Sequence, residues 1–479
     1  MRKTKIICTL GPAVDDENTL RKMIENGMNC CRLNFSHGTH EEQQVRIDRI
    51  KKIREDLKVN LPILLDTKGP EIRVKNFENG SVELQSGQEF TLAVGDAPGN
   101  QKQVSLTYDK LAQSVQIGTR ILIDDGKIAM EVKEIQGSIV VCTVINGGKV
   151  SDHKSINVPN VVIPMPYMSD TDKSDILFGI ENEIDYIAAS FVRTAADVHQ
   201  LRDFLIENGA PTIRIISKIE NVQGVERMDE IIDASDGIMV ARGDLGVEIP
   251  FRKLPSIQKE MIRKCYLKGK EVVTATQMLE SMTKNPRPTR AEVSDVANAI
   301  FDGTTAIMLS GESAAGEYPV EAVRTMAEIA DSAEEAMADS SVSTADRIDP
   351  LKDNLRFGSG FMDAIAISAC TSADYLNAKA IIVLSRTGST ARTIANYRPA
   401  CPIIAVVVES RCCRQLNLSY GVCPVQATLH KDTSDLFEYA IHKAKTTGLV
   451  KSGDNVVLIG GSSIAAGSPD DLLKLCQIP

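Results

Sequence analysis

Two short segments of this 479-residue chain end in charged side chains that suit phosphoryl chemistry. In residues 215–220 and 239–244, an apolar run carries charge only at its C-terminal end. Burying such charges without partners costs free energy, so they need a compensating role. Glu220 and Asp244 offer the oxygen ligands that a hard divalent cation prefers, and Lys218 suits a phosphate group. The combination indicates phosphoryl or enolate chemistry around Mg²⁺.

Eight short apolar runs must position these side chains, and most are separated by segments with helical periodicity. The runs cover residues 5–9, 30–36, 63–67, 186–191, 213–220, 237–244, 272–277 and 306–311. Strand–helix alternation repeated in this way predicts an α/β fold, a (β/α)8 TIM barrel built from residues 1–69 and 167–340. Polar residues at the C-terminal ends of such strands face the active site.

The predicted strand ends are rich in polar side chains. They carry Thr9, Arg32, Asn34, Ser36, Asp66, Thr67, Lys68, Ser190, Lys218, Glu220, Arg242, Asp244, Thr276, Gln277, Ser310 and Glu312. A structural hydrogen bond explains any one of them more simply. The whole set, gathered at one mouth, favours an active site.

Two further domains are expected. Residues 70–166 alternate polar and apolar side chains or are β-branched, which predicts a small inserted β-barrel placed at the mouth as a lid. Residues 337–360 are rich in Ser, Ala and Asp and indicate a linker. Residues 350–479 again alternate strand-like and helical segments, which predicts a C-terminal α/β domain with an open sheet.

A possible anion site lies in this last domain, where a predicted strand ends and a helix begins. Its residues are Ser385, Thr387, Ser389 and Thr390. Hydroxyls and free N–H groups at a helix N-terminus bind anions, although a simple helix cap explains the same residues.

Bulk composition excludes several classes of protein. The net charge of −10 and the 4% aromatic content disfavour binding to nucleic acid or to an anionic membrane. Eleven scattered cysteines form no disulfide or zinc pattern and indicate reduced thiols in the cytoplasm. We find no signal peptide and no apolar run long enough to span a membrane.

Four segments resemble the pyruvate kinase family and occur in the family's order. They are residues 65–73, 216–221, 238–246, and 275–281 running into 286–292. The resemblance implies the family's barrel, inserted lid and C-terminal regulatory domain. It also implies transfer of the phosphoryl group of phosphoenolpyruvate to ADP, giving pyruvate and ATP in the last step of glycolysis.

The resemblance also implies roles for residues at the predicted mouth. Lys218 is similar to the residue that neutralises the transferring phosphoryl oxygens, a clamp that favours the transition state over the ground state. Glu220 and Asp244 are similar to the Mg²⁺ ligands. The implied substrate contacts are Lys218, Ala241, Arg242, Gly243, Asp244 and Thr276.

Other positions match phosphate, nucleotide and K⁺ contacts of the family. The implied catalytic set is Lys218, Arg32, Thr276 and Arg73, and the implied nucleotide contacts are Arg32, Asn34, His37, Pro12 and Lys154. The implied K⁺ ligands are Asn34, Ser36, Asp66 and Thr67. Relatives that work without K⁺ resemble one another in carrying a lysine at the position of Glu71, so a carboxylate there implies K⁺ dependence. We expect a water relayed by Thr276 and Ser310 to protonate the enolate.

The C-terminal domain resembles the family's allosteric domain. The four residues from Ser385 to Thr390 named above match its effector-phosphate loop, and the second loop at residues 460–464 offers no lysine or arginine. This absence favours a monophosphate activator such as AMP or ribose 5-phosphate over fructose 1,6-bisphosphate. A homotetramer is expected, because its symmetry suits sigmoidal kinetics.

Three alternatives stay open. The first is another phosphoenolpyruvate enzyme on a barrel, such as a carboxylase or aldolase, for which ADP-dependent turnover would be absent. The second is a catalytically silent metabolite-binding sensor, disfavoured by the intact Lys218, Glu220 and Asp244. The third is a nucleic-acid-binding role, which charge and composition disfavour.

Overall fold

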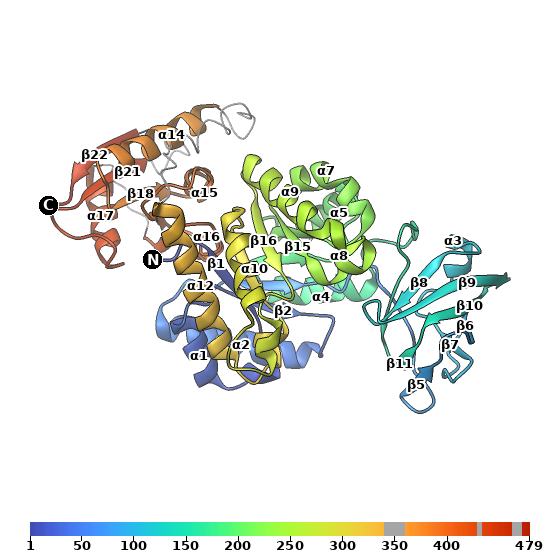
Figure 1. Cartoon of the computed structure of the whole chain (residues 1–479). Helices are drawn as coiled ribbons and strands as arrows, with labels where there is room; N and C mark the ends of the chain where they lie inside the picture. The colour runs from blue at the N-terminus through green and yellow to red at the C-terminus, as the bar shows by residue number, and fades with distance from the viewer. Residues whose placement is uncertain (340–359, 429–433, 462–471) are drawn as a thin grey trace.

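Three bodies lie in a row, with the lid and the C-terminal domain on opposite sides of the barrel (Figure 1). The structure is a computed structural model and describes residues 1–339, 360–428, 434–461 and 472–479. Most of the linker predicted at 337–360, and residues 462–464 of the second effector loop, lie outside this part of the chain.

The predicted TIM barrel is confirmed: eight parallel strands close in the order β1-β17-β16-β15-β14-β13-β3-β2. Their bounds are β1 (Lys5–Thr9), β2 (Cys30–Asn34), β3 (Ile63–Asp66), β13 (Tyr186–Ala189), β14 (Arg214–Ile219), β15 (Gly237–Ala241), β16 (Glu271–Ala275) and β17 (Ala306–Leu309). The predicted runs mostly extended past the strand ends. The largest difference is at β15, where Arg242 opens the short helix α8 (Arg242–Glu248).

Helices surround the barrel, and shorter helical turns follow several strand ends. The long helices are α1 (Glu17–Glu25), α2 (His40–Leu57), α4 (Asp170–Glu181), α5 (Ala195–Glu207), α7 (Met228–Ala234), α9 (Leu254–Leu267), α10 (Arg290–Phe301) and α12 (Pro319–Asp339). The turns are η1 (Pro12–Val14), α6 (Val222–Glu226), η2 (Phe251–Lys253), η3 (Glu280–Thr283) and α11 (Gly311–Ala314). Capping boxes begin α2, α4 and α10 and satisfy N–H groups that the first turn leaves free.

One side chain of the C-terminal domain completes the core inside the barrel. The cluster consists of Ile7, Cys30, Leu64, Tyr186, Ala188, Ile216, Met239, Val273, Ala275, Ala306, Met308 and Leu418. All but Leu418 come from barrel strands. The barrel is therefore packed rather than hollow, and Leu418 fills it from the end opposite the mouth.

The inserted residues fold into a curled sheet of seven strands, in the order β4-β12-β8-β9-β10-β6-β7. The strands are β4 (Ile72–Arg73), β6 (Glu89–Ala93), β7 (Gln103–Ser105), β8 (Arg120–Ile123), β9 (Ile128–Gln136), β10 (Ile139–Asn146) and β12 (Ser155–Asn157), with β5 (Ser81–Leu84) and β11 (Gly148–Ser151) as a separate pair and one helix, α3 (Leu111–Ser114). A bridge from Val74 to Leu106 joins the two outer edges, so the sheet closes on its own apolar core.

The C-terminal domain is an α/β layer with the strand order β20-β19-β18-β21-β22. Its strands are β18 (Ala380–Ser385), β19 (Ile403–Val407), β20 (Val422–Gln426), β21 (Asn455–Gly460) and β22 (Leu472–Gln477). Its helices are α14 (Gly360–Tyr375), α15 (Ser389–Asn396), α16 (Ser410–Leu416) and α17 (Ser434–Lys445). The sequence did not predict β22, the antiparallel edge strand.

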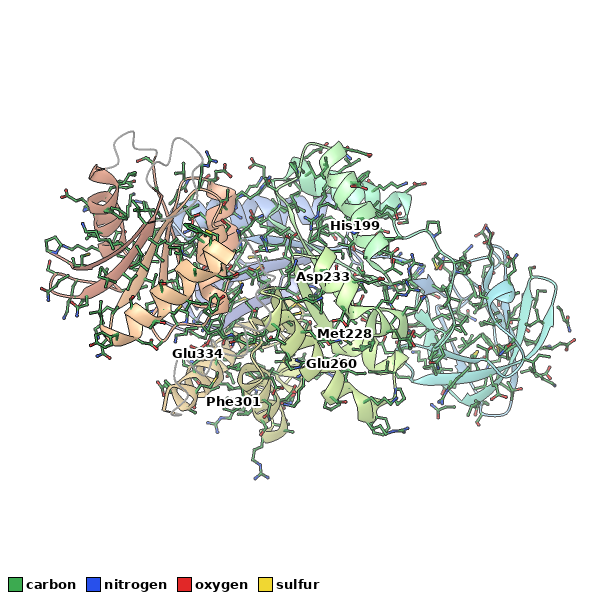
Figure 2. The ribbon with its side chains drawn as sticks, turned by 90° about the horizontal axis from the view of Figure 1, so that it is seen from above. His199, Met228, Asp233, Glu260, Phe301 and Glu334 are labelled. Atoms are coloured by element: carbon green, nitrogen blue, oxygen red, sulfur yellow. The ribbon has the colours of Figure 1, made fainter. Side chains whose placement is uncertain are left out.

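Buried hydrogen bonds fix this domain to the floor of the barrel. Tyr186 Oη donates to the Gln415 carbonyl at 2.7 Å, and Lys5 Nζ donates to the Val422 carbonyl at 2.7 Å. Glu334 of α12, labelled in Figure 2, accepts the N–H of Lys3 at 2.8 Å, and Lys3 Nζ donates to the Pro399 carbonyl of the C-terminal domain at 3.2 Å. No helix of the described residues has the length and apolar character needed to cross a membrane.

Candidate active site

Lys218, at the end of β14, lies among oxygen atoms from neighbouring strand ends. Its Nζ donates to Asp66 Oδ1 at 3.0 Å and to Ser190 Oγ at 2.8 Å, and it lies 2.9 Å from Glu220 Oε1. Burial lowers the pKa of Lys218, but Asp66 and Glu220 outweigh it and raise the pKa above its usual value. The side chain is therefore a fixed cation at the mouth.

Asp66 joins Lys218 to a second cation. Its Oδ2 accepts from Arg32 Nε at 2.6 Å, and Arg32 Nη1 donates to Thr9 Oγ1 at 2.8 Å. Burial raises the pKa of Asp66, but Arg32 and Lys218 lower it below its ordinary value. Two buried cations share this one carboxylate, an arrangement that attracts a phosphate anion.

Glu220 is buried and Asp244 is half-buried, and the two carboxylates lie beside Lys218. Glu220 Oε2 accepts the N–H of Phe191 at 2.7 Å, and its Oε1 lies 2.9 Å from Lys218 Nζ. Burial raises the pKa of both carboxyl groups. Within the described ranges, no group of three His, Cys, Asp or Glu side chains forms a metal cage. Two neighbouring carboxylates suit Mg²⁺, which would take its remaining ligands from substrate and water.

Thr276 follows β16 and faces the start of α8. Its Oγ1 accepts the Gly243 N–H at 2.8 Å and donates to the Ala275 carbonyl at 2.6 Å. The backbones of Thr276 and Gln277 are left-handed, with φ of 66° and 54°. The Arg242 side chain does not join the Lys218 cluster: it donates instead to the Thr276 carbonyl at 2.6 Å.

Oxygen donors of the expected K⁺ set lie at the adjacent ends of β2 and β3. Asn34 and Asp66 are partners in the strand register, and Asn34 Oδ1 accepts the N–H of Ser36 at 3.1 Å. Thr67 Oγ1 accepts the N–H of Ser190 at 3.1 Å. The structure thus brings all four expected residues to one corner of the mouth.

The remaining predicted contacts divide between the mouth and the lid. Arg73 Nε lies 2.8 Å from Glu71 Oε2, and burial raises the pKa of Glu71. Burial lowers the pKa of His37, and the nearby charges of Arg73 and Arg32 lower it further. Lys154 pairs with Asp124 of the lid at 2.8 Å.

Pro12 lies in the barrel, whereas the four predicted effector residues lie in the C-terminal domain. Pro12 begins η1, directly after β1. Ser385 Oγ accepts the Gly388 N–H at 3.2 Å, and the exposed hydroxyls of Thr387 and Ser389 lie 3.1 Å apart. Thr390 is buried in the first turn of α15. These four residues belong to the C-terminal domain, on the side of the barrel away from the lid (Figure 1).

Two residues of the site received no role from the sequence. Ser190 Oγ accepts from Lys218 and donates to the Thr67 carbonyl at 2.6 Å. In the sequence, its position at the end of a predicted barrel strand was the feature that could have assigned Ser190 to the site. Asp295, in the middle of α10, accepts from Arg242 at 2.6 Å, and nothing in its sequence context distinguishes it from a solvent-facing carboxylate.

A TIM barrel with a fixed lysine beside two carboxylates, and with a lid at its mouth, defines a barrel phosphotransferase. Residues 1–323 match the family model described as pyruvate kinase, barrel domain, and residues 363–476 match pyruvate kinase, alpha/beta domain. The chain belongs to the pyruvate kinase family, which confirms the resemblance found in the four segments.

Individual relatives agree along the whole chain. It is 46% identical over 479 residues to a pyruvate kinase of Clostridium perfringens, covering 100% of both chains. It is 48% identical over 476 residues to one of Clostridium acetobutylicum, covering 99% of each. A crystal structure of a pyruvate kinase from Cryptosporidium parvum superposes with a TM-score of 0.92 at 40% identity, covering 100% of this chain and 96% of that one.

Proposed function

We propose that this chain transfers the phosphoryl group of phosphoenolpyruvate to ADP at the barrel mouth, with Mg²⁺ and K⁺ bound there. The observation that carries the proposal is the Lys218 cation, held at 3.0 Å from Asp66 and 2.8 Å from Ser190 beside the carboxylates of Glu220 and Asp244. Family membership supports the same reaction. The presence of Lys218, Glu220 and Asp244 together argues against the alternative of a catalytically silent sensor.

Lys218 and Arg32 stabilise the negative charge on the transferring phosphoryl group. Both cations are fixed before the reaction by Asp66, so they need no reorganisation as charge develops. Arg73 adds a phosphate contact from the lid side. Positions Pro12, Asn34 and His37 are assigned to the nucleotide, and Lys154 reaches it from the lid.

Glu220 and Asp244 would hold Mg²⁺, which supplies Lewis-acid stabilisation of phosphate and enolate oxygens when bound. The Thr276 hydroxyl contacts the substrate carboxylate, and the backbone of Ala241, Arg242, Gly243 and Asp244 lines its pocket. Ser310 Oγ is buried without a hydrogen-bond partner. Together with Thr276 it orders the water that protonates the enolate of pyruvate.

Asn34, Ser36, Asp66 and Thr67 would bind K⁺ through oxygen atoms. Glu71 is a carboxylate, so the chain supplies no lysine cation of its own at that position and depends on the bound ion. A positive charge close to the transferring phosphoryl group stabilises the transition state strongly, because a site with little water screens charges weakly.

We further propose a division of labour among the domains. Residues 1–69 and 167–340 form the catalytic barrel, 70–166 the lid, and 350–479 the regulatory domain. The loop at Ser385, Thr387, Ser389 and Thr390 binds a monophosphate activator, AMP or ribose 5-phosphate. The enzyme works as a homotetramer in the cytoplasm.

The substitution Lys218→Met tests the role of the central cation. Methionine keeps the length of the side chain and removes its charge, so kcat falls by about 10³-fold or more, while the affinity for phosphoenolpyruvate changes much less. Lys264→Met is a matched control, because Lys264 pairs with Asp229 on the outer helices at 2.8 Å. Unchanged kcat with weakened substrate binding would contradict the assigned role.

A further inference from the structure

Thr276 is held in a conformation that a β-branched residue rarely adopts. Its φ of 66° and the φ of 54° at Gln277 place two consecutive non-glycine residues in the left-handed region. Such strain persists only where surrounding contacts enforce it, and it is concentrated at functional sites. The contacts that enforce it here are therefore part of the site.

Arg242 supplies those contacts from the opposite side of the loop. Its Nη2 donates to the Thr276 carbonyl at 2.6 Å, and its Nε donates to the same oxygen at 3.1 Å. Nε also lies 3.3 Å from the Ala275 carbonyl. The Arg242 side chain is 8% exposed, so its guanidinium binds these carbonyl groups with little competition from water.

Asp295 determines where this guanidinium lies. Both of its carboxylate oxygens accept from Arg242 Nη1, at 2.8 Å and 2.6 Å. The side chain is 38% exposed and projects from α10, whose first turn is fixed by a capping box. Glu292 of that turn also accepts the Ser281 N–H at 2.7 Å, so α10 holds the loop after Thr276 at a second point.

We infer that Asp295 is a positioning residue for phosphoenolpyruvate turnover. It orients Arg242, Arg242 clamps the left-handed Thr276 peptide, and the clamp keeps the Thr276 hydroxyl against the Gly243 N–H. The inference rests on the assignment of Thr276 to substrate binding and enolate protonation. Asp295 itself touches no substrate and acts through the side chain of Arg242 and the backbone of Thr276.

The substitution Asp295→Asn tests this chain of contacts, because it keeps the shape and removes the charge that holds Arg242. We expect kcat/KM for phosphoenolpyruvate to fall about tenfold, since small misplacements of reacting groups are costly. KM for ADP stays unchanged, because the nucleotide residues lie elsewhere. Deuterium uptake into the methyl group of pyruvate in D2O, followed by NMR, slows in parallel, because this exchange reports proton transfer to the enolate, the step assigned to Thr276.

Asp302→Asn is the matched control. Asp302 ends the same helix and pairs with Lys259, away from the mouth. If both variants lose activity only in proportion to lost folded protein, as measured by circular dichroism, Asp295 is structural and the inference fails. Should Asp295→Asn not fold, Arg242→Lys makes the same test, since it keeps the charge and loses the planar guanidinium.

Thr276→Val separates the inference from the function on which it rests. If Thr276→Val slows the exchange reaction and Asp295→Asn does not, the clamp is wrong and the role of Thr276 stands. If Thr276→Val leaves both turnover and exchange unchanged, the assignment of Thr276 is itself wrong.

Discussion

Among single side chains, Asp66 has the most demanding role at the mouth. It is buried on β3 and binds Lys218 and Arg32 together. Losing it would leave two buried cations without a counter-charge, which is costlier than losing an exposed ion pair. From the sequence, Asp66 was predicted only as a K⁺ ligand, and nothing indicated that it also pairs with both Lys218 and Arg32.

Leu418 is the side chain through which the C-terminal domain completes the barrel core. Leu418→Ala leaves a cavity among packed strand residues and lowers the free energy of unfolding by roughly 2–5 kcal/mol. Urea unfolding monitored by circular dichroism measures the loss. Leu177→Ala is the control, because Leu177 is 39% exposed on α4. If both substitutions lower the free energy of unfolding by the same small amount, Leu418 does not complete the barrel core.

The sequence identified residues whose place in a strand signals their role, and it missed those defined by contacts between elements. Lys218 and Glu220 were found because charge interrupts an apolar run at its end. Asp295 was missed because an aspartate within an amphipathic helix has the same local pattern whether or not an arginine reaches it. Leu418 lies in a loop and is buried only by the barrel of another domain.

Strands and helices were predicted best where periodicity was strong. All eight barrel runs became strands, but the segment at 237–244 was taken as one strand, and its last three residues open α8. Charge after an apolar run fits a strand end and a first helical turn equally well. The edge strand β22 was missed because its pattern is short and several of its side chains are exposed.

The junction of β18 and α15 carries the prediction about regulation. Exposed hydroxyls of Thr387 and Ser389 flank Gly388, whose φ of 72° allows the turn into the helix. We expect AMP or ribose 5-phosphate to lower the phosphoenolpyruvate concentration at half-maximal rate by about fivefold or more. Initial-rate curves with and without each compound measure this effect.

The double variant Thr387→Val with Ser389→Ala is the control for this loop. It should remove the activation and leave turnover at saturating phosphoenolpyruvate unchanged. A shift produced by fructose 1,6-bisphosphate, with none from AMP or ribose 5-phosphate, would contradict the choice of a monophosphate.

Seen whole, the molecule places its C-terminal domain and its candidate active site at opposite ends of the barrel strands. The C-terminal domain binds the barrel floor through α16 and the loop that follows it, and the lid meets the mouth (Figure 1). α16 also packs against the turn at Gly388, because a Cβ at Gly388 would lie 2.9 Å from Cys412 and from Leu416. The division into three domains was predictable from pattern changes along the chain, whereas this docking arises from tertiary contacts alone.

The initial rate of pyruvate formation from phosphoenolpyruvate, ADP and Mg²⁺, compared in KCl and in NaCl, tests the whole mouth at once. Lys218, the carboxylate pair and the K⁺ corner must all act together for turnover. We predict fast pyruvate formation in KCl and little in NaCl. The carboxylate of Glu71 supplies no positive charge at this position, so a bound K⁺ must supply it. Equal rates in the two salts would contradict the K⁺ site, and no pyruvate in either salt, with or without AMP, would contradict the phosphotransferase itself.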